Sequence, residues 1–305
     1  MVPRSNTSVI VVNWNGLADT QRCLQSLDAV RAEWSRCFVI DNGSVDGSAE
    51  AVRREFPWAF VIASGTNLGY AGGNNVGIRA ALDAGADAVF LLNNDATVSE
   101  GPIARLYEYT ASDPSVAFAG PLSWEVGCCF LGGILTRRPF AVAERWQLTR
   151  PEASAPSDVD YASGRALFVR RPVIDRIGVL DERLFLTWED TDWAERARTA
   201  GLRSVIVPTA EIRHRGSASF GGLFSPLYCY YYFRNMLLFA HLHFPLAERG
   251  RAYRDVFGFA RLTLHRYVRK RRGATALAMA VGVLHFATGR FGPSPRLLSR
   301  WLRRK

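Results

Sequence analysis

Short apolar runs alternate with amphipathic stretches through the N-terminal part of the chain. The runs that have the length and β-branched content of buried strands are residues 8–13, 37–41, 59–64 and 89–92. Between them apolar side chains recur at helical spacing, as at Leu17, Leu24 and Leu27. This alternation predicts a parallel sheet whose strands are joined by right-handed crossover helices.

The later part of the chain follows a different pattern. Residues 161–171 and 203–208 are typical of strands. Residues 189–201 form a helical pattern with acids in the first turn, arginines later and Gly201 at its end. Beyond Ser225 the pattern is wholly helical. Together these features predict an α/β fold with a mostly parallel central sheet, flanking helices and a C-terminal helical extension.

Each predicted strand of the first part ends in polar residues. These are Asn13, Asp41, Ser64 and the run Asn93–Asn94–Asp95. Ligands of parallel sheets bind beyond the carboxyl ends of the strands, so this edge is the expected site. Asp95 could cap a helix, but Ser99 is the better cap for the helix that follows. A carboxylate left free in this way suits a hard cation such as Mg²⁺ or Mn²⁺.

Two other segments of the first part have the chemistry of a nucleotide site. The glycine-rich turn at residues 67–75 opens a helix, where backbone N–H groups and the helix dipole favour a phosphate. The alternative is that Gly72 and Gly73 only form a turn. Asp41 could accept the N3–H of a uracil or thymine ring, or could form an ordinary Asx-turn.

The acids at 189 and 190 start a helix beside several apolar side chains. Leu186, Trp188 and Trp193 could surround a carboxylate that acts as a general base near neutral pH. The same acids could instead only stabilise the helix dipole. His214, between two arginines, is more typical of a surface residue than of a ligand when it is taken alone.

The composition indicates the cellular compartment and shows that charge is distributed unevenly along the chain. The chain has five cysteines among its 305 residues and no C-x-x-C pair, which favours a reducing cytosol over a disulfide scaffold or zinc site. Residues 1–8 are polar and do not resemble a signal peptide. Residues 249–305 carry a net charge of +14, which leaves −4 on the rest of the chain. Such a tail favours an anionic membrane, a nucleic acid or plain solvation.

The motifs acquire a common meaning when they are read in order. They are VVNWNG, VIDNGSVDGS, NLGYAGGNN, FLLNNDATV, LDERLFLTWEDTDWAERARTAG, HRGSAS and, on a following helix at residues 230–240, YYYFRNMLLFA. This set resembles the inverting glycosyltransferases with the GT-A fold, specifically glycosyltransferase family 2 and its rhamnosyltransferase-like branch. The resemblance implies a GT-A catalytic domain over residues 1–224. Its donor-binding half would cover about 1–120 and its acceptor-binding half about 121–224.

The resemblance also implies a role for each motif residue. Asp190 would be the catalytic base, with Glu189 as a neighbour that positions the acceptor. Asp95 would bind the divalent cation, Mg²⁺ or Mn²⁺, with His214 as a second ligand. The residues implied to bind the donor are Asn13, Asn15, Asp41, Asn67, Gly72, Gly73, Asn74, Asn93 and Asn94. Two departures from the family pattern are Asn93 in place of the first acid of D-x-D, and Arg165 where small residues are expected.

The implied reaction moves a sugar from a nucleoside-diphosphate sugar to an acceptor hydroxyl in one displacement. We expect dTDP-rhamnose as donor, with UDP-hexoses next, and a glycan or lipid-linked acceptor. The alternatives from other classes are a sugar nucleotidyltransferase and a non-enzymatic membrane or nucleic-acid binder that uses the basic tail. No RNA-binding signature is present in that tail, so no nucleic-acid partner is expected.

The helical region at residues 225–305 is expected to contact a membrane surface or a second copy of the chain. Its apolar segment at residues 274–287 is shorter than the roughly 20 residues that cross a bilayer. Arginines and lysines alternate with Leu, Trp and Tyr in residues 266–272 and 296–305, which is typical of helices that lie in the membrane interface. We therefore expect a cytoplasmic protein at the inner face of the cell membrane, with a homodimer contact as the alternative.

Overall fold

The computed structural model of the protein describes residues 6–152, 155–216, 225–269 and 272–295. Its strands are β1 (Thr7–Asn13), β2 (Arg36–Asp41), β3 (Ala59–Ala63), β4 (Ala88–Asn93), β5 (Ala96–Val98), β6 (Val116–Glu125), β7 (Cys128–Arg137), β8 (Phe140–Gln147), β9 (Ser157–Val159), β10 (Ala166–Arg170) and β11 (Arg203–His214). Its helices are α1 (Leu17–Ala29), the 3-10 helix η1 (Arg31–Glu33), α2 (Ser48–Glu55), α3 (Gly69–Asp83), α4 (Pro102–Ser112), α5 (Arg171–Ile177), α6 (Glu189–Thr199), α7 (Pro226–His243), α8 (Leu246–Arg269) and α9 (Gly273–Ala287).

The strands form one mixed sheet in the order β3-β2-β1-β4-β10-β6-β11-β5. The N-terminal strands β1 to β4 are parallel to one another, which confirms the arrangement that the apolar runs predicted. β10 lies antiparallel between β4 and β6, and β11 runs parallel to β6. The antiparallel insertion of β10 was not expected from the sequence. It joins β6 and β11 to the end of the parallel sheet.

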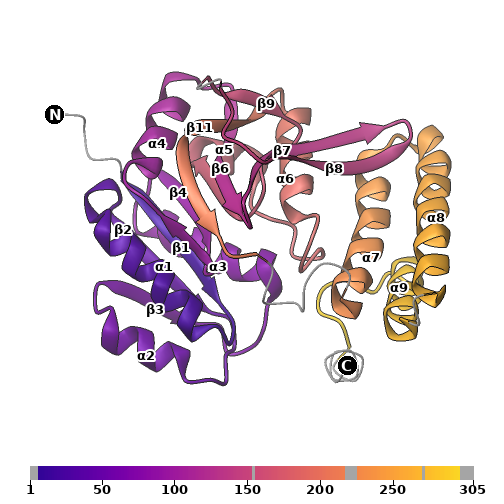
Figure 1. The fold of residues 1–305 in the computed structure, drawn as a ribbon, viewed down its shortest axis with the longest axis horizontal. Helices are drawn as coiled ribbons and strands as arrows, with labels where there is room; N and C mark the ends of the chain where they lie inside the picture. Colours follow the sequence, from indigo (N-terminus) through magenta and orange to yellow (C-terminus); the bar gives the residue numbers. More distant parts are fainter. Residues whose placement is uncertain (1–5, 153–154, 217–224, 270–271, 296–305) are drawn as a thin grey trace.

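Helices cover both faces of the sheet, so that its strands are buried on each side (Figure 1). Val9 and Val11 point into the core shared with α1, α2 and α4, whereas Ile10 points into the core shared with α3, α5 and α6. This alternation follows from the two-residue period of a strand. Gly77 lets α3 approach the sheet closely, because a Cβ there would lie 2.4 Å from Ile10 Cγ2.

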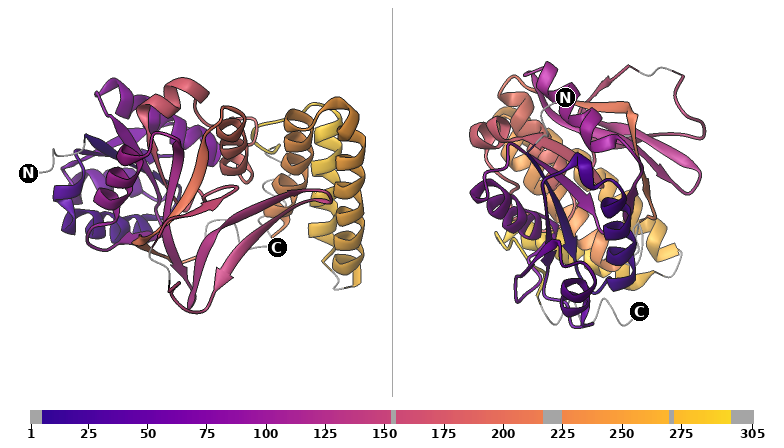
Figure 2. Two further views of the ribbon diagram at one scale, coloured as in Figure 1. Left: turned by 90° about the horizontal axis from the view of Figure 1, so that it is seen from above. Right: turned by 90° about the vertical axis from the view of Figure 1, so that its left-hand side faces the viewer.

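The hairpin formed by β7 and β8 extends from the sheet toward the C-terminal helices, as Figures 1 and 2 show. The Phe140 ring stacks on the Phe239 ring of α7 at 5.9 Å and packs edge-on against Phe244. The backbone N–H of Phe140 donates to the Asp255 carboxylate of α8 at 2.9 Å. Hairpin and helices therefore share one apolar core, and α7 is almost wholly buried.

The C-terminal region contains the helices α7, α8 and α9, as the helical pattern predicted, and the described residues 288–295 after α9 are not helical. Within those residues, no helix combines the length and apolarity that crossing a membrane requires. The basic residues 296–305, residues 270 and 271, and the end of the HRGSAS motif lie outside the described residues.

The prediction that Ser99 caps the helix after β5 is wrong. Ser99 precedes the helix but does not cap it, because α4 begins only at Pro102. The Glu33 carboxylate, from η1, accepts backbone N–H groups of Gly101, Ile103 and Ala104 at 2.6, 3.0 and 3.2 Å. A long side chain from a distant segment therefore supplies the cap that a local pattern assigned to serine.

Candidate active site

A cavity of about 280 Å³ opens beyond the carboxyl ends of β1 and β4, at the sheet edge where a site was expected. Its other walls come from α3, α6, α7 and β8, and from residues 161–165 and 185–188. The predicted site residues that line it are Asn67, Asn74, Asn93, Asn94, Asp95, Glu189, Asp190 and His214. Those that do not line it are Asn13, Asn15, Asp41, Gly72 and Gly73. The structure thus brings the residues implied as catalytic and metal-binding to one cavity.

Asp95 and His214 meet on the wall of this cavity formed by the strand ends. Asp95 follows β4, and the pairing of β5 with the end of β11 places Ala96 opposite His214. The Nε2 atom of His214 lies 3.0 Å from Asp95 Oδ1 and 3.3 Å from Asn93 Nδ2. Both side chains of the Asp95–His214 pair are buried. A carboxylate oxygen and an imidazole nitrogen therefore converge at the tip of β4.

Glu125 holds the other nitrogen of the His214 ring. Its Oε2 atom lies 3.1 Å from His214 Nδ1 and 3.3 Å from Arg165 Nε. Burial favours a lower pKa for His214, but the hydrogen bonds to Asp95 and Glu125 raise that pKa above its ordinary value. The hydrogen bond from His214, together with the charge of Arg165, lowers the pKa of Glu125 despite its burial. A carboxylate on Nδ1 orients the ring in the way common to metal-binding histidines.

A buried polar network joins the ends of β1 and β2. The Asn13 amide donates to Asp41 Oδ1 at 3.2 Å and to Ser48 Oγ at 2.7 Å, and its oxygen accepts from Thr20 at 2.8 Å. The Asn15 side chain accepts a backbone N–H from the turn after β2 at 2.8 Å. Asn13 is only 1% exposed, so its amide acts within the protein and holds the Asp41 carboxylate at the strand end.

The glycine-rich turn packs closely against two neighbours. Gly69 has a φ of 76°, and a Cβ there would lie 2.3 Å from the Phe185 carbonyl oxygen. At Gly73 a Cβ would lie 2.8 Å from Val12 Cγ1. The Asn67 carboxamide accepts the N–H of Gly69 at 2.8 Å and shapes the start of α3. These glycines bring the N-terminus of α3 against the sheet edge and against the connector before α6.

Backbone donors fix the Asp190 carboxylate at the start of α6. The Gly164 N–H donates to Oδ2 at 3.0 Å, and the Thr191 N–H donates to Oδ1 at 2.7 Å. The Tyr70 hydroxyl of α3 donates to the Gly164 carbonyl, which links α3 to this loop. Burial, and then the charge of Asp190, raise the pKa of Glu189 well above its ordinary range. The two adjacent acids therefore have different surroundings, and the neutral form is favoured for Glu189.

The connector before α6 adopts left-handed backbone conformations. Phe185, Thr187 and Trp188 have φ values of 62°, 64° and 73°. Such residues each cost of the order of 1–3 kcal/mol and persist where neighbours over-determine them. Here Arg234 and Asn235 of α7 donate hydrogen bonds to backbone carbonyls of this connector and of the residues just before it. The C-terminal region thus fixes the segment that leads into Asp190.

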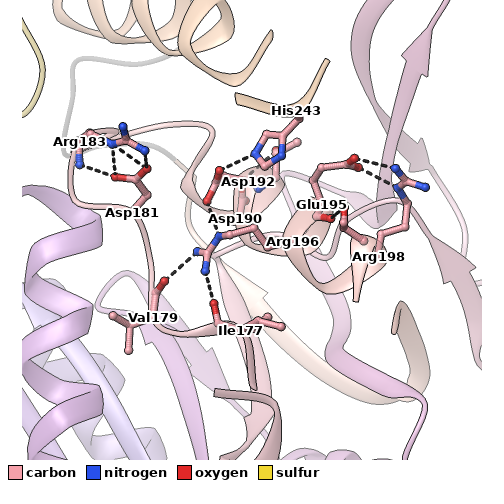
Figure 3. A network of polar contacts seen from close by, with 12 residues as sticks. Ile177, Val179, Asp181, Arg183, Asp190, Asp192, Glu195, Arg196, Arg198 and His243 are labelled. Atoms are coloured by element: carbon pink, nitrogen blue, oxygen red, sulfur yellow. Dashed lines mark hydrogen bonds and ion pairs between the residues drawn. The ribbon is translucent and has the colours of Figure 1, made fainter. Parts of the chain in front are cut away.

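Further bonds hold α6 itself, as Figure 3 shows. The Asp192 carboxylate accepts from Arg196 Nε at 3.0 Å and lies 2.7 Å from His243 Nε2, at the end of α7. Arg196 also donates to the Val179 carbonyl at 2.7 Å. The first turn of α6, which carries Asp190, is therefore tied both to α7 and to the loop that follows α5.

The sequence patterns missed several cavity residues, namely Asn42, Tyr70, Glu144, Tyr228 and Tyr232. Asn42 follows Asp41 directly, so the strand-end argument could have included it. Tyr228 and Tyr232 are four residues apart and share a helix face, but nothing in the sequence indicates that this face meets the cavity. Arg165, noted as a departure, lines the cavity and pairs with the Glu144 carboxylate at 3.2 Å.

Comparisons with known proteins agree with this geometry. The model of the family described as Glycosyl transferase family 2 matches residues 8–177. An N-acetylglucosaminyl-diphospho-decaprenol L-rhamnosyltransferase of Mycobacterium tuberculosis is 30% identical over 236 residues, which cover 70% of this chain and 77% of that protein. A dTDP-rhamnosyl transferase of Shigella flexneri is 28% identical over 194 residues, which cover 61% of this chain and 64% of that protein.

Solved structures extend the likeness of fold. A mannosyltransferase from Pyrobaculum calidifontis in complex with GDP-Man and Mn²⁺ has a TM-score of 0.57 and 14% identity, covering 99% of this chain and 80% of that one. GalNAc-T7 with UDP, GalNAc and Mn²⁺ has a TM-score of 0.58 and 16% identity, covering 70% and 44%. These likenesses support the GT-A fold. Because the family model spans more than half of the chain, this protein belongs to glycosyltransferase family 2, in its rhamnosyltransferase-like branch, and is a glycosyltransferase.

Proposed function

We propose that the protein transfers a rhamnosyl residue from dTDP-rhamnose to a hydroxyl group of a lipid-linked glycan precursor, with inversion at the anomeric carbon. The names of the two relatives support this donor and this class of acceptor, and UDP-hexoses are the next candidate donors. The observation that carries the chemistry is that Asp190 and the Asp95–His214 pair line one cavity. Family membership argues against the nucleotidyltransferase and the non-enzymatic binder.

Asp190 is the proposed general base. Its carboxylate takes the proton of the acceptor hydroxyl as that oxygen forms a bond to the anomeric carbon and the bond to the nucleoside diphosphate breaks. The N–H groups of Gly164 and Thr191 hold the carboxylate in one orientation, so a hydroxyl can approach from the cavity side. Glu189 lies beside it and positions the acceptor.

The donor nucleotide is proposed to lie along the strand ends and the start of α3. Asp41 would accept the N3–H of the base, with Asn13 and Asn15 around it. The residues proposed to hold the ribose, diphosphate and sugar are Asn67, Gly72, Gly73, Asn74, Asn93 and Asn94. The dipole of α3 favours the diphosphate near its N-terminus. The first N–H groups of this helix are bonded within the protein, that of Gly69 to Asn67 and those of Tyr70 and Ala71 to the Phe185 carbonyl.

A divalent cation fits the donor set formed by Asp95 and His214. Asp95 Oδ1 and His214 Nε2 converge, and Glu125 orients the ring through Nδ1. Among the described residues no cluster of three or more His, Cys, Asp or Glu side chains could hold a metal ion. A cation held by this pair would therefore take its other ligands from diphosphate oxygens and water. When bound, it would offset the charge that develops on the leaving diphosphate.

Donor binding should depend on Mn²⁺ through Asp95. In the wild type we expect dTDP-rhamnose to raise the Tm more with Mn²⁺ than without it, because a ligand of the folded state stabilises that state. Asp95→Ala should remove most of this Mn²⁺-dependent increase and weaken donor affinity, measured by calorimetry, at least about tenfold. His214→Ala should act in the same direction but less strongly.

The matched control is Asp83→Ala, which removes an exposed carboxylate at the far end of α3. The same measurements with UDP-glucose rank the two proposed donors. An equal response to Mn²⁺ in the wild type and in Asp95→Ala would rule out the metal-binding role of Asp95.

The exposed face of α8 is proposed to hold the protein at the inner face of the cell membrane. Arg254, Phe257, Arg261, Leu264 and Val268 recur at helical spacing and are exposed to solvent. Arginines beside apolar side chains are typical of helices that lie in the interface of an anionic membrane. Because α7 is largely buried, α8 is the better candidate for a membrane contact. Binding through α8 would bring the cavity close to a lipid-linked acceptor.

Charge reversal on α8 should release the protein from anionic vesicles. Each basic residue near an anionic surface contributes about 1 kcal/mol, so Arg254→Glu with Arg261→Glu should weaken binding at least about thirtyfold in a flotation assay. Arg53→Glu with Arg54→Glu, on exposed positions of α2, is the matched control. Equal flotation of the two double variants, or binding that ignores lipid charge and salt, would refute the membrane contact.

A further inference from the structure

Consecutive residues at the start of α6 present polar atoms that have no partner. Thr187 Oγ1, Trp188 Nε1 and Glu189 Oε2 are buried and make no hydrogen bond to any described residue. Trp188 and Glu189 are 4% and 6% exposed, and all three residues line the cavity. A buried polar atom without a partner costs about 1–3 kcal/mol, so a group of them is uncommon away from a functional site.

An aromatic wall stands beside these atoms. The Trp188 ring lies 5.7 Å from the Tyr232 ring, and Tyr232 stacks on Tyr228 at 5.5 Å with an interplanar angle of 23°. Both tyrosines come from α7 and line the cavity, and neither is fully buried. Val142 and Glu144 of the β7–β8 hairpin complete this end of the cavity. Ring faces with a few polar groups at their edge are typical of sites for small amphipathic ligands.

We propose that this recess, formed by Thr187, Trp188, Glu189, Tyr228 and Tyr232, is the subsite that binds the pyranose ring of the acceptor sugar. A pyranose has apolar C–H faces and a rim of hydroxyl groups, so it matches a wall of aromatic rings with unpartnered polar atoms beside it. Asp190 lines the same cavity as Glu189, so a ring bound here would present a hydroxyl to the cavity that holds the proposed base. The proposal rests on the proposed transfer function.

The polar atoms of the recess have complementary roles. The Trp188 N–H can only donate, and therefore requires a hydroxyl oxygen. Burial raises the pKa of Glu189, so its carboxyl group keeps a proton to higher pH than an exposed one. The carboxyl group accepts hydrogen bonds in either form and also donates one when it is protonated. Glu144 is engaged by Arg165 and by the Trp146 N–H at 3.0 Å, so it shapes the rim. The recess thus contains both donors and acceptors, as recognition of sugar hydroxyls requires.

Helix α7 contributes to the recess in two ways. The two tyrosines lie on the first turns of α7, and Arg234 and Asn235 further along the same helix bind the connector that ends in Trp188. One helix therefore supplies the aromatic wall and fixes the segment that carries the polar atoms. Its neighbour α8 carries the face proposed to contact the membrane, which favours an acceptor that arrives on a lipid.

Substitution of Tyr232 separates the acceptor subsite from the donor site. With dTDP-rhamnose as donor and N-acetylglucosaminyl-diphospho-farnesol as acceptor probe, Tyr232→Leu should lower kcat/KM for the acceptor at least about tenfold, mainly through KM. Tyr232→Phe keeps the ring and should stay within about twofold of the wild type. Calorimetric affinity for dTDP-rhamnose with Mn²⁺ should be unchanged in both variants. Tyr253→Leu, an aromatic change on α8 outside the cavity, is the control.

A second measurement tests the acceptor subsite independently of the donor assignment. Saturation-transfer NMR with methyl N-acetylglucosaminide should give a signal for the wild type and for Tyr232→Phe that is lost in Tyr232→Leu. Such a Tyr232-dependent signal without any turnover of dTDP-rhamnose would reject the donor assignment and retain the subsite. Turnover with an unchanged acceptor KM in Tyr232→Leu, an equal loss in Tyr232→Phe, or no saturation transfer to the wild type would overturn the subsite.

Discussion

Asp190→Asn is expected to reduce kcat at least about a hundredfold while leaving the affinity for the donor nucleotide nearly unchanged. The amide cannot accept the proton of the acceptor hydroxyl, so the loss falls on the chemical step. The amide oxygen can still accept the Thr191 N–H that now binds Oδ1 at 2.7 Å, whereas the NH2 group cannot accept the Gly164 N–H that binds Oδ2, so one of the two orienting hydrogen bonds is lost. Single-turnover kinetics and donor calorimetry together measure the two quantities.

Asp175→Asn provides the matched control for this substitution. Asp175 is exposed on α5, where it pairs with Arg171, so its conversion to an amide should leave kcat and donor affinity unchanged. A hundredfold loss that also appears as weaker donor binding would move Asp190 from catalysis to donor binding. An Asp190→Asn enzyme that keeps more than about a tenth of the wild-type kcat would show that another group is the base.

The parallel, N-terminal part of the sheet could be predicted from sequence because its signals are local. Strand periodicity and polar strand ends located Asn13, Asp41 and Asp95 at one sheet edge, where the parallel pairing of β1, β2 and β4 brings them. The sequence could not show which of these residues are engaged in contacts within the protein. The amide of Asn13 is hydrogen-bonded within a buried network. Position 73 favours glycine because a Cβ there would lie too close to Val12. Their proposed contacts with the donor stay predictions.

The later strands and the C-terminal helices depend on contacts between segments that are distant in the chain. Glu125 reaches His214 because β6 lies beside β11, a pairing across 89 positions that no local pattern encodes. Residues 161–171 were predicted as a strand, and the strand β10 covers Ala166–Arg170 of this stretch. Its direction is set by its partners β4 and β6. The tyrosines of α7 show the same limit, because helical spacing reveals a shared face and not what that face contacts.

Arg234 shows how much of the site depends on the C-terminal helices. Its guanidinium is 0% exposed and has no carboxylate partner among the described residues. It donates to the carbonyls of Arg183, Leu184 and Gly292 at 3.0, 3.1 and 2.7 Å. The Tyr231 ring lies 4.8 Å from it, and burial lowers its pKa. One cation therefore binds the connector before α6 and the segment after α9 together.

Arg234→Leu is expected to lower the free energy of unfolding by about 3–5 kcal/mol, because it leaves several buried carbonyl oxygens without donors at once. The urea midpoint and the Tm measure this loss, and Arg254→Leu, at an exposed position of α8, should change the free energy of unfolding by less than about 0.5 kcal/mol. Arg234→Lys keeps the charge but cannot reach the same set of acceptors, so it should fall between the two. If Arg234→Leu has the same urea midpoint as Arg254→Leu, the connector before α6 is held by Asn235 and by packing alone. If it is destabilised as expected, its folded fraction should also turn over more slowly, because the strained residues that lead into Asp190 have lost their support.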